Sequence, residues 1–244
     1  MFRHFIIALQ FLTRIPVPHL QDISQLEIGR SFRYYPLVGL VIGFFLLALG
    51  WLISDIPSTL QASLVLLLWI IITGALHLDG LADSADAWLG GHGDREKTLA
   101  IMKDAACGPA GVIALVIILL IKFNALNLIL QEGKWMFLLL TPLLARTAVL
   151  FLFQTTTYVR PGGLGEALAS YYSHGVGSII LLAVCLATLL MMGISGLIVI
   201  LALLITVLLL RGLMIKRIGG TTGDTAGALI EISEVVLLVA GVLI

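Results

Sequence analysis

The sequence predicts an all-α, polytopic membrane protein. We expect a helical bundle of about seven transmembrane helices, preceded by a short N-terminal interfacial helix. Composition is the first reason: 60% of the 244 residues are hydrophobic and only 11% are charged, whereas soluble domains carry about 25% charged residues. The second reason is that the apolar residues fall into runs long enough to cross a bilayer, which takes roughly 20 residues per helix. Residues 1–244 are interpreted as a single integral-membrane domain.

The chain begins with an apolar stretch, Phe2 to Thr13, that is too short to span a bilayer. It predicts an interfacial helix that ends near Pro16. A polar segment over residues 21–33 follows. The transmembrane runs are then expected at Leu37–Ile53, Leu60–Leu78, Gly111–Leu130, Trp135–Phe153, Ser178–Met192, Gly196–Ile215 and Thr225–Ile244.

The distribution of basic residues predicts the orientation, because cytoplasmic loops carry an excess of Lys and Arg. With seven spans, the basic residues outside the membrane gather on one side, and only Lys134 lies on the other. We therefore expect a multi-pass protein of the cell (inner) membrane with a cytoplasmic N-terminus. The net charge is zero, and no basic patch with interleaved aromatic residues indicates a nucleic-acid partner.

Three acids lie close together after the second run, in a chain that otherwise has few charges. Asp79, Asp83 and Asp86 have the spacing i, i+4, i+7, which puts them on one face of a helix. Two carboxylates about 6 Å apart repel each other by roughly 3 kcal/mol at an effective dielectric near 20. A helix N-terminus favours acids, but this explains one or two of them and not a stripe of three. The pattern predicts a site for Mg²⁺, which binds oxygen ligands together with substrate phosphates.

A glycine-rich turn leads into the last span on the same predicted side of the membrane. Glycine lets the backbone approach an anion closely, and a helix N-terminus offers free N–H groups to phosphate. A plain turn with an N-cap explains the stretch equally well when it is taken alone, but the shared side favours a site. The predicted substrate-binding residues are Gly219, Gly220, Thr221, Thr222 and Gly223, and Asp224 and Glu231, which share a helical face, are predicted metal ligands.

Charged residues also occur inside the predicted spans, where such residues usually face a cavity or a partner. We expect Arg146 to take part in catalysis by reaching a phosphate, and Lys122 to contribute to substrate binding. The alternatives for both are snorkelling to the membrane surface and a structural ion pair with Glu231 or Glu234.

Two residues near the aspartate stripe are weaker candidates. Asp104 is a predicted further metal ligand, although a plain surface acid explains it equally well. His77 falls roughly opposite the aspartate stripe on a helical wheel, which favours packing or a supporting hydrogen bond over a role as general base.

These motifs resemble the cobalamin synthase family, also called adenosylcobinamide-GDP ribazoletransferase. The resemblance is carried by His77 with Asp79-Gly-Leu-Ala-Asp83-Ser-Ala-Asp86, and by Gly219-Gly-Thr-Thr-Gly-Asp224-Thr225. Phe11-Leu-Thr-Arg14-Ile-Pro-Val-Pro18 and Tyr35-Pro-Leu-Val-Gly39 are similar too, so the likeness extends over essentially the whole chain. Ser84 and Ala87 depart from the commoner Thr and Gly, but the acids are all in place.

The resemblance implies the reaction and its partners. Family members join adenosylcobinamide-GDP to α-ribazole or its 5'-phosphate at the cytoplasmic membrane, with release of GMP and a requirement for Mg²⁺. Phosphoryl transfer needs charge neutralisation more than covalent help, which agrees with the carboxylates and cations above. Asp83 or Asp86 is the expected acceptor of the proton from the attacking hydroxyl. A homo-oligomer, or a complex with other cobalamin-assembly enzymes, is a further expectation.

Two other functions compete with this one. A CDP-alcohol phosphotransferase also has an aspartate-rich membrane motif, but Asp83 stands where that family has Arg, and the later acids have a different spacing. A cation-coupled transporter would use Glu231, Glu234 and Arg146 as a midplane site, and it would leave the aspartate stripe without a role.

Overall fold

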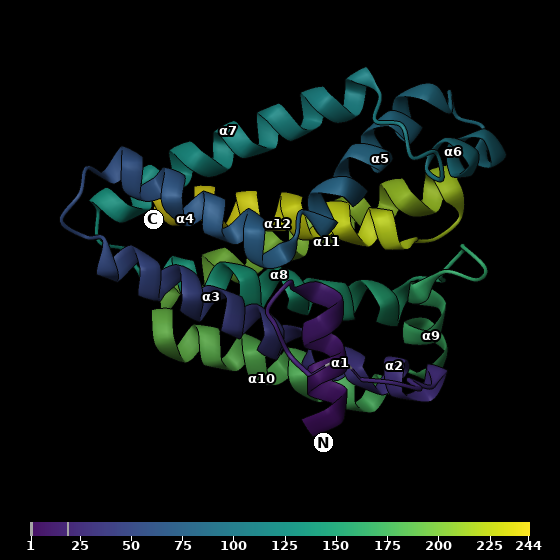
Figure 1. Cartoon of the computed structure of the whole chain (residues 1–244), viewed down its shortest axis with the longest axis horizontal. Coiled ribbons are helices and arrows are strands. Elements are labelled where there is room, and N and C mark those ends of the chain that lie inside the picture. The colour runs from purple at the N-terminus through teal and green to yellow at the C-terminus, as the bar shows by residue number, and fades with distance from the viewer. Residues whose placement is uncertain (1, 19) are drawn as a thin grey trace.

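A computed structural model describes residues 2–18 and 20–244, except for the side chain of Leu164. The described chain is a bundle of long, roughly parallel helices with short helices gathered at one end (Figure 1). The helices are α1 (Phe2–Leu12), α2 (Gln25–Ser31), the 3₁₀ helix η1 (Phe32–Tyr34), α3 (Tyr35–Leu52), α4 (Ser58–Thr73), α5 (Leu76–Gly90), α6 (Arg95–Ile101), α7 (Pro109–Gln131), α8 (Met136–Thr155), α9 (Leu164–Tyr171), α10 (His174–Met192), α11 (Ile194–Ile218) and α12 (Gly223–Leu243).

The predicted all-α membrane bundle is confirmed. Six segments of the described chain are long and apolar enough to cross a membrane, and the bent pair α4 and α5 makes a seventh when it is counted as one span. The short apolar helix α1 precedes them, as the N-terminal pattern predicts. The break between α10 and α11 falls at Gly193, whose φ of +57° ends the first of these helices.

The second predicted span, Leu60–Leu78, is wrong at its C-terminal end. Helix α4 stops at Thr73, and the chain turns by 86° before α5 begins at Leu76. Gly74 and Ala75 both adopt left-handed backbone angles, with φ of +61° and +58°, a conformation that ends a helix. His77 and the aspartates therefore share one helix that leaves the bundle obliquely.

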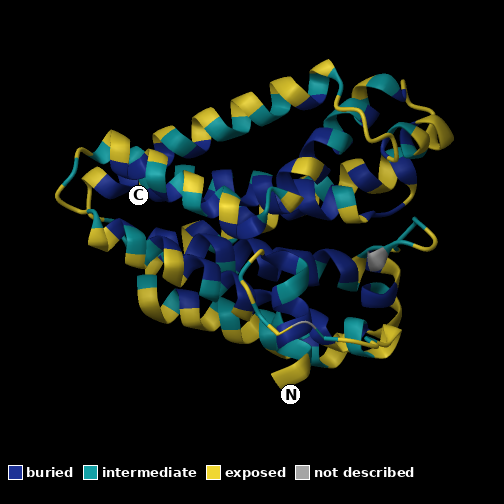
Figure 2. Ribbon diagram, viewed as in Figure 1, coloured by how far each residue is buried: buried dark blue, intermediate teal, exposed yellow. Residues whose placement is uncertain are grey.

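Two helices form the centre of the bundle. Helices α8 and α12 are the most buried of the candidate spans, whereas α7, α10 and α11 expose much of their apolar surface (Figure 2). Helix α3 approaches α8 closely because Gly39 and Gly43 face it: a Cβ at either position would lie 2.8 Å from a backbone atom of α8. Small residues at such positions let membrane helices pack tightly.

The two ends of the bundle differ. The α3–α4 connection and the C-terminus lie at one end, at the left of Figure 1. Helices α2, α6 and α9 lie at the other end, together with the loop that enters α12. The apolar pattern of the sequence does not predict these three short helices. For α2, the capping box between Ser24 and Glu27 is the local signal that was available.

Candidate active site

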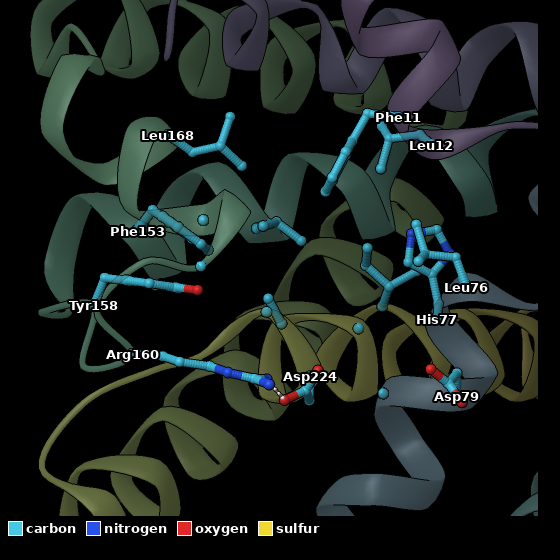
Figure 3. Close-up of a pocket in the computed structure, with 18 of the residues that line it drawn as sticks. Phe11, Leu12, Leu76, His77, Asp79, Phe153, Tyr158, Arg160, Leu168 and Asp224 are labelled. Atoms are coloured by element: carbon cyan, nitrogen blue, oxygen red, sulfur yellow. Dashed lines mark hydrogen bonds and ion pairs between the residues drawn. The ribbon is translucent and has the colours of Figure 1, made fainter. Parts of the chain in front are cut away.

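A cavity of about 450 Å³ lies between α1, α5, α8, α12 and the segment that follows α8. Its polar wall contains Asp79, Asp224, Arg160 and Tyr158 (Figure 3). Its apolar wall comes from distant parts of the chain and includes Phe11, Leu12, Phe153, Leu168 and Ile230. The cavity thus combines a charged surface with room for a large, partly apolar ligand.

The predicted aspartate helix forms one side of this site. Asp79, Asp83 and Asp86 all lie on α5, and Asp79 lines the cavity. Asp83 is close enough to Asp79, Asp86 and Asp224 to interact with each electrostatically. Three carboxylates of α5 and one of α12 therefore share a single electrostatic environment.

Close contact between α5 and α12 brings the two acidic faces together. The contact depends on Gly80, because a Cβ there would lie 2.8 Å from the carbonyl oxygen of Asp224. Gly227, one turn further along α12, faces the backbone of His77. Two acidic faces meet, as expected from the sequence, because a glycine on each helix lets α5 and α12 pack closely.

Arg160 brings a positive charge to the cavity. Its Nη1 lies 2.5 Å from Asp224 Oδ2, and both side chains are partly exposed (Figure 3). A short parallel bridge holds the segment of Arg160 against the loop before α12: Thr221 N–H donates to the Thr157 carbonyl at 2.9 Å, and Val159 N–H donates to the Thr221 carbonyl at 2.9 Å. These backbone bonds fix Arg160 over the N-terminus of α12.

The glycine-rich turn divides into a buried part and an open part. Thr221 and Thr222 are fully buried, and the Thr222 side chain caps α12 by accepting from Thr225 N–H. Gly220 packs against the Thr157 carbonyl. Gly223 lines the cavity and has open space beside its Cα. Gly219, with φ of +78°, ends α11. Of the predicted phosphate-binding residues, Gly223 alone faces the cavity.

Two predicted metal ligands, Asp86 and Asp104, bind backbone N–H groups away from the cavity. Asp86 accepts hydrogen bonds from the N–H groups of Gly108, at 2.7 Å, and Gly111, at 2.9 Å. It therefore joins α5 to the N-terminus of α7, where a carboxylate is favourable. Asp104 is exposed and accepts from Ala106 N–H at 3.0 Å. Neither residue lines the cavity.

The intramembrane charges form a buried cluster with one another. Lys122 Nζ lies 2.8 Å from Glu231 Oε2 and 2.5 Å from Glu234 Oε2. Arg146 pairs with the other oxygen of Glu234. All four side chains are at most 4% exposed. The structural ion pairs, which the sequence allowed as an alternative to a role at the substrate, are therefore present. None of these four residues lines the cavity.

The cavity could hold a divalent cation only with help from a ligand. In the described part of the chain, no group of three or more His, Cys, Asp or Glu side chains is arranged to hold a metal ion. Asp79 and Asp224 nevertheless face the same cavity, with Asp83 nearby. Magnesium is commonly held by one or two carboxylates, substrate phosphates and waters. This donor set fits such an ion.

Comparison with known proteins identifies the family. The family model described as cobalamin-5-phosphate synthase matches residues 4–242. The chain belongs to the cobalamin-5-phosphate synthase family. Its relatives include proteins named adenosylcobinamide-GDP ribazoletransferase from Pseudomonas syringae pv. syringae, which is 50% identical over 234 residues, and from Pseudomonas putida, which is 52% identical over 234 residues. In each case the match covers 96% of both chains. No solved structure matches the chain.

The structure adds two site residues that the sequence motifs do not single out. Arg160 is one of the basic residues outside the predicted spans, and Tyr158 belongs to none of the motifs named above. Burial raises the pKa of the Tyr158 phenol, against the opposing effect of the neighbouring Arg160 guanidinium, so the phenol stays protonated and able to donate. The available signal was local: Arg160 directly precedes Pro161-Gly162-Gly163, a stretch typical of a tight turn.

Proposed function

We propose that this protein joins adenosylcobinamide-GDP to α-ribazole, or to its 5'-phosphate, and releases GMP. The reaction assembles the nucleotide loop of cobalamin. The names of the relatives support this activity, together with their 50% and 52% identity over 96% of the chain. The observation that carries it is the meeting of Asp79 of α5 with Asp224 of α12, beside Arg160, in one cavity.

The chemistry requires two tasks of the protein: neutralising charge on the diphosphate and accepting a proton. The ribazole hydroxyl oxygen attacks the phosphorus on the cobinamide side of the diphosphate, and the bond from that phosphorus to the bridging oxygen breaks. GMP leaves with the bonding electron pair, and the hydroxyl proton passes to a carboxylate. Arg160 offers fixed positive charge to the diphosphate, and Asp79, Asp83 and Asp224 are the carboxylates close enough to accept the proton.

Magnesium is part of this proposal. Asp79 and Asp224 would hold the ion, with Asp83 as a nearby third carboxylate, and diphosphate oxygens and water would complete its shell. When bound, Mg²⁺ neutralises charge on the diphosphate and on the departing phosphate. Because substrate oxygens would supply further ligands, two cavity-facing carboxylates would be enough to hold the ion.

The decisive experiment is product analysis with the purified protein in lipid nanodiscs. Adenosylcobinamide-GDP, α-ribazole 5'-phosphate and Mg²⁺ should yield one GMP per cobalamin product, and EDTA should stop the reaction until Mg²⁺ is restored. Asp83→Asn and Asp224→Asn should each abolish GMP release in a protein that still inserts and keeps its helix content. Asp55→Asn, in the exposed α3–α4 connection, is the matched control. Turnover near the wild-type rate in either site variant would refute the metal-site assignment.

We further propose that the protein lies in the inner membrane with the cavity open to the cytoplasm, as the distribution of basic residues predicts. Cys107, in the connection between α6 and α7, is exposed and free. A membrane-impermeant maleimide should label Cys107 in inverted membrane vesicles and not in intact spheroplasts. A Cys185→Ala background removes the second cysteine, and the reverse labelling pattern would overturn the orientation. Association with itself or with other cobalamin-assembly enzymes stays a prediction, which cross-linking in membranes would test.

The competing functions have less support. A transporter site built from Glu231, Glu234 and Arg146 would need free charges, but these side chains neutralise one another and Lys122 in a buried cluster. A CDP-alcohol phosphotransferase would release CMP from a cytidine substrate. The same product analysis, run with CDP-alcohol substrates, separates that activity from GMP release.

A further inference from the structure

His77 is buried, yet one of its ring nitrogens has no partner in the protein. The side chain is 3% exposed and lies in the wall of the cavity, two residues before Asp79 on α5 (Figure 3). Its Nδ1 lies 3.3 Å from Nη2 of Arg146. Its Nε2 makes no hydrogen bond among the described residues. A buried polar atom without a partner is costly, so a partner from a ligand would relieve that penalty.

The contact with Arg146 decides which nitrogen carries the proton. A guanidinium group has N–H donors and no acceptor, so His77 Nδ1 must accept the hydrogen bond. In a neutral imidazole the proton then sits on Nε2. The unpartnered Nε2 of this cavity-lining residue is therefore a donor.

The buried cluster keeps this arrangement in place and keeps the ring neutral. Arg146 is held by Glu234, and Glu234 is held in turn by Lys122, which also binds Glu231. Two cations and two carboxylates cancel, so the cluster has no free carboxylate to hold a second proton on His77. The cluster thus supports a neutral imidazole with a defined tautomer.

We propose that His77 donates its Nε2–H to a phosphoryl oxygen of the nucleotide diphosphate bound in the cavity, and that Arg146 and Glu234 are positioning residues that hold its tautomer. The proposal rests on the function proposed above and refines it. His77 cannot serve as the base at Nε2, because that nitrogen already carries a proton and Nδ1 faces Arg146. Acceptance of the hydroxyl proton is left to the aspartates, and the intramembrane Arg146 acts through His77 without touching substrate.

A pair of substitutions separates donation to substrate from mere support of Arg146. The amide of Asn lies about as far from the backbone as Nδ1 does, and the amide of Gln about as far as Nε2. His77→Asn should keep an acceptor for Arg146 but lose the donor in the cavity, whereas His77→Gln should keep a donor there. Loss of a hydrogen bond to a charged oxygen predicts a fall in kcat/KM of about 10- to 150-fold for His77→Asn, and a smaller fall for His77→Gln. The opposite order would show that His77 only supports Arg146 and would overturn the proposal.

The tautomer can also be measured directly, without measuring turnover. In ¹⁵N-histidine-labelled protein in nanodiscs, which has five histidines, the His77→Gln spectrum identifies the His77 signals. We expect an unprotonated Nδ1 and a protonated Nε2, and a change in the Nε2 signal when GDP and Mg²⁺ are added to saturation. Arg146→Met should release Nδ1 and allow both tautomers. A proton on Nδ1, or an Nε2 signal unmoved by saturating GDP and Mg²⁺, would overturn the proposal. Failure of the wild-type protein to release GMP would instead count against the proposed function, because the tautomer is measured without turnover.

Discussion

Replacement of Lys122 by Met tests the buried ion-pair cluster most sharply. Lys122 is 3% exposed, and its Nζ contacts Glu231 at 2.8 Å and Glu234 at 2.5 Å. Methionine keeps an unbranched, flexible apolar stem but removes the charge. Two buried carboxylates would then remain against the single guanidinium of Arg146. The variant therefore leaves the cluster with one unpaired negative charge.

The contact distances set the magnitude. At 2.8 Å and an effective dielectric near 20, one ion pair attracts by about 6 kcal/mol, against a desolvation penalty of several kcal/mol for each ion. Removal of one partner of a buried pair destabilises proteins by about 3–5 kcal/mol. Because Lys122 neutralises two carboxylates, we expect a loss near the upper end, about 4–5 kcal/mol in the free energy of unfolding. In the double variant Lys122→Met/Glu231→Gln the charges of Arg146 and Glu234 balance. Its free energy of unfolding should therefore be about 2–3 kcal/mol higher than that of Lys122→Met alone.

Reversible unfolding in mixed micelles, titrated with SDS and followed by far-ultraviolet circular dichroism, measures both variants against the wild type. Glu231→Gln alone completes the double-mutant cycle. A Lys122→Met protein within about 1 kcal/mol of the wild type, or a double variant no more stable than Lys122→Met alone, would refute the charge-balance reasoning.

Two further predictions concern the cavity. Gly80→Ala should lower the rate of GMP release by about 10-fold or more, because the new Cβ would lie 2.8 Å from the Asp224 carbonyl oxygen and must push α5 from α12. Gly212→Ala is the control, because a Cβ at that position would have nothing within 4 Å. Equal rates for the two variants would contradict the importance of the α5–α12 contact. Arg160→Met should raise KM for adenosylcobinamide-GDP by about 10- to 100-fold through loss of a charge-assisted contact to phosphate. Lys216→Met removes a charge from an exposed position near the same end of the bundle, and a comparable rise in KM there would mean that Arg160 acts only through general electrostatic attraction.

The membrane bundle was predictable because few backbone structures are stable in lipid. A spanning helix must satisfy its backbone hydrogen bonds internally and present an apolar surface, so each span appears as a local run of apolar residues. Trp135–Phe153 was predicted where α8 covers Met136–Thr155. The same local logic placed Asp79, Asp83 and Asp86 on one helix, because the spacing of side chains on a helix is fixed by its pitch.

The bend between α4 and α5 was not predictable in this way. Apolar residues continue on both sides of Gly74 and Ala75, so hydropathy alone extends one helix through the turn. The 86° angle depends on two consecutive left-handed residues, and an alanine in that conformation gives no signal in a single sequence. This turn is what aims the aspartates of α5 toward α12.

The sequence by itself therefore determined the class of protein, its spans and the acidic character of its site, because these properties depend on residues within a few turns of one another. Only the tertiary structure decided which charges face the cavity and which neutralise each other. Arg160 enters through a backbone bridge to the loop before α12, while Arg146 and Lys122 are paired with acids of α12. The partner of a buried charge is chosen by helix packing across 88 to 112 residues of sequence, a distance over which no local pattern carries information.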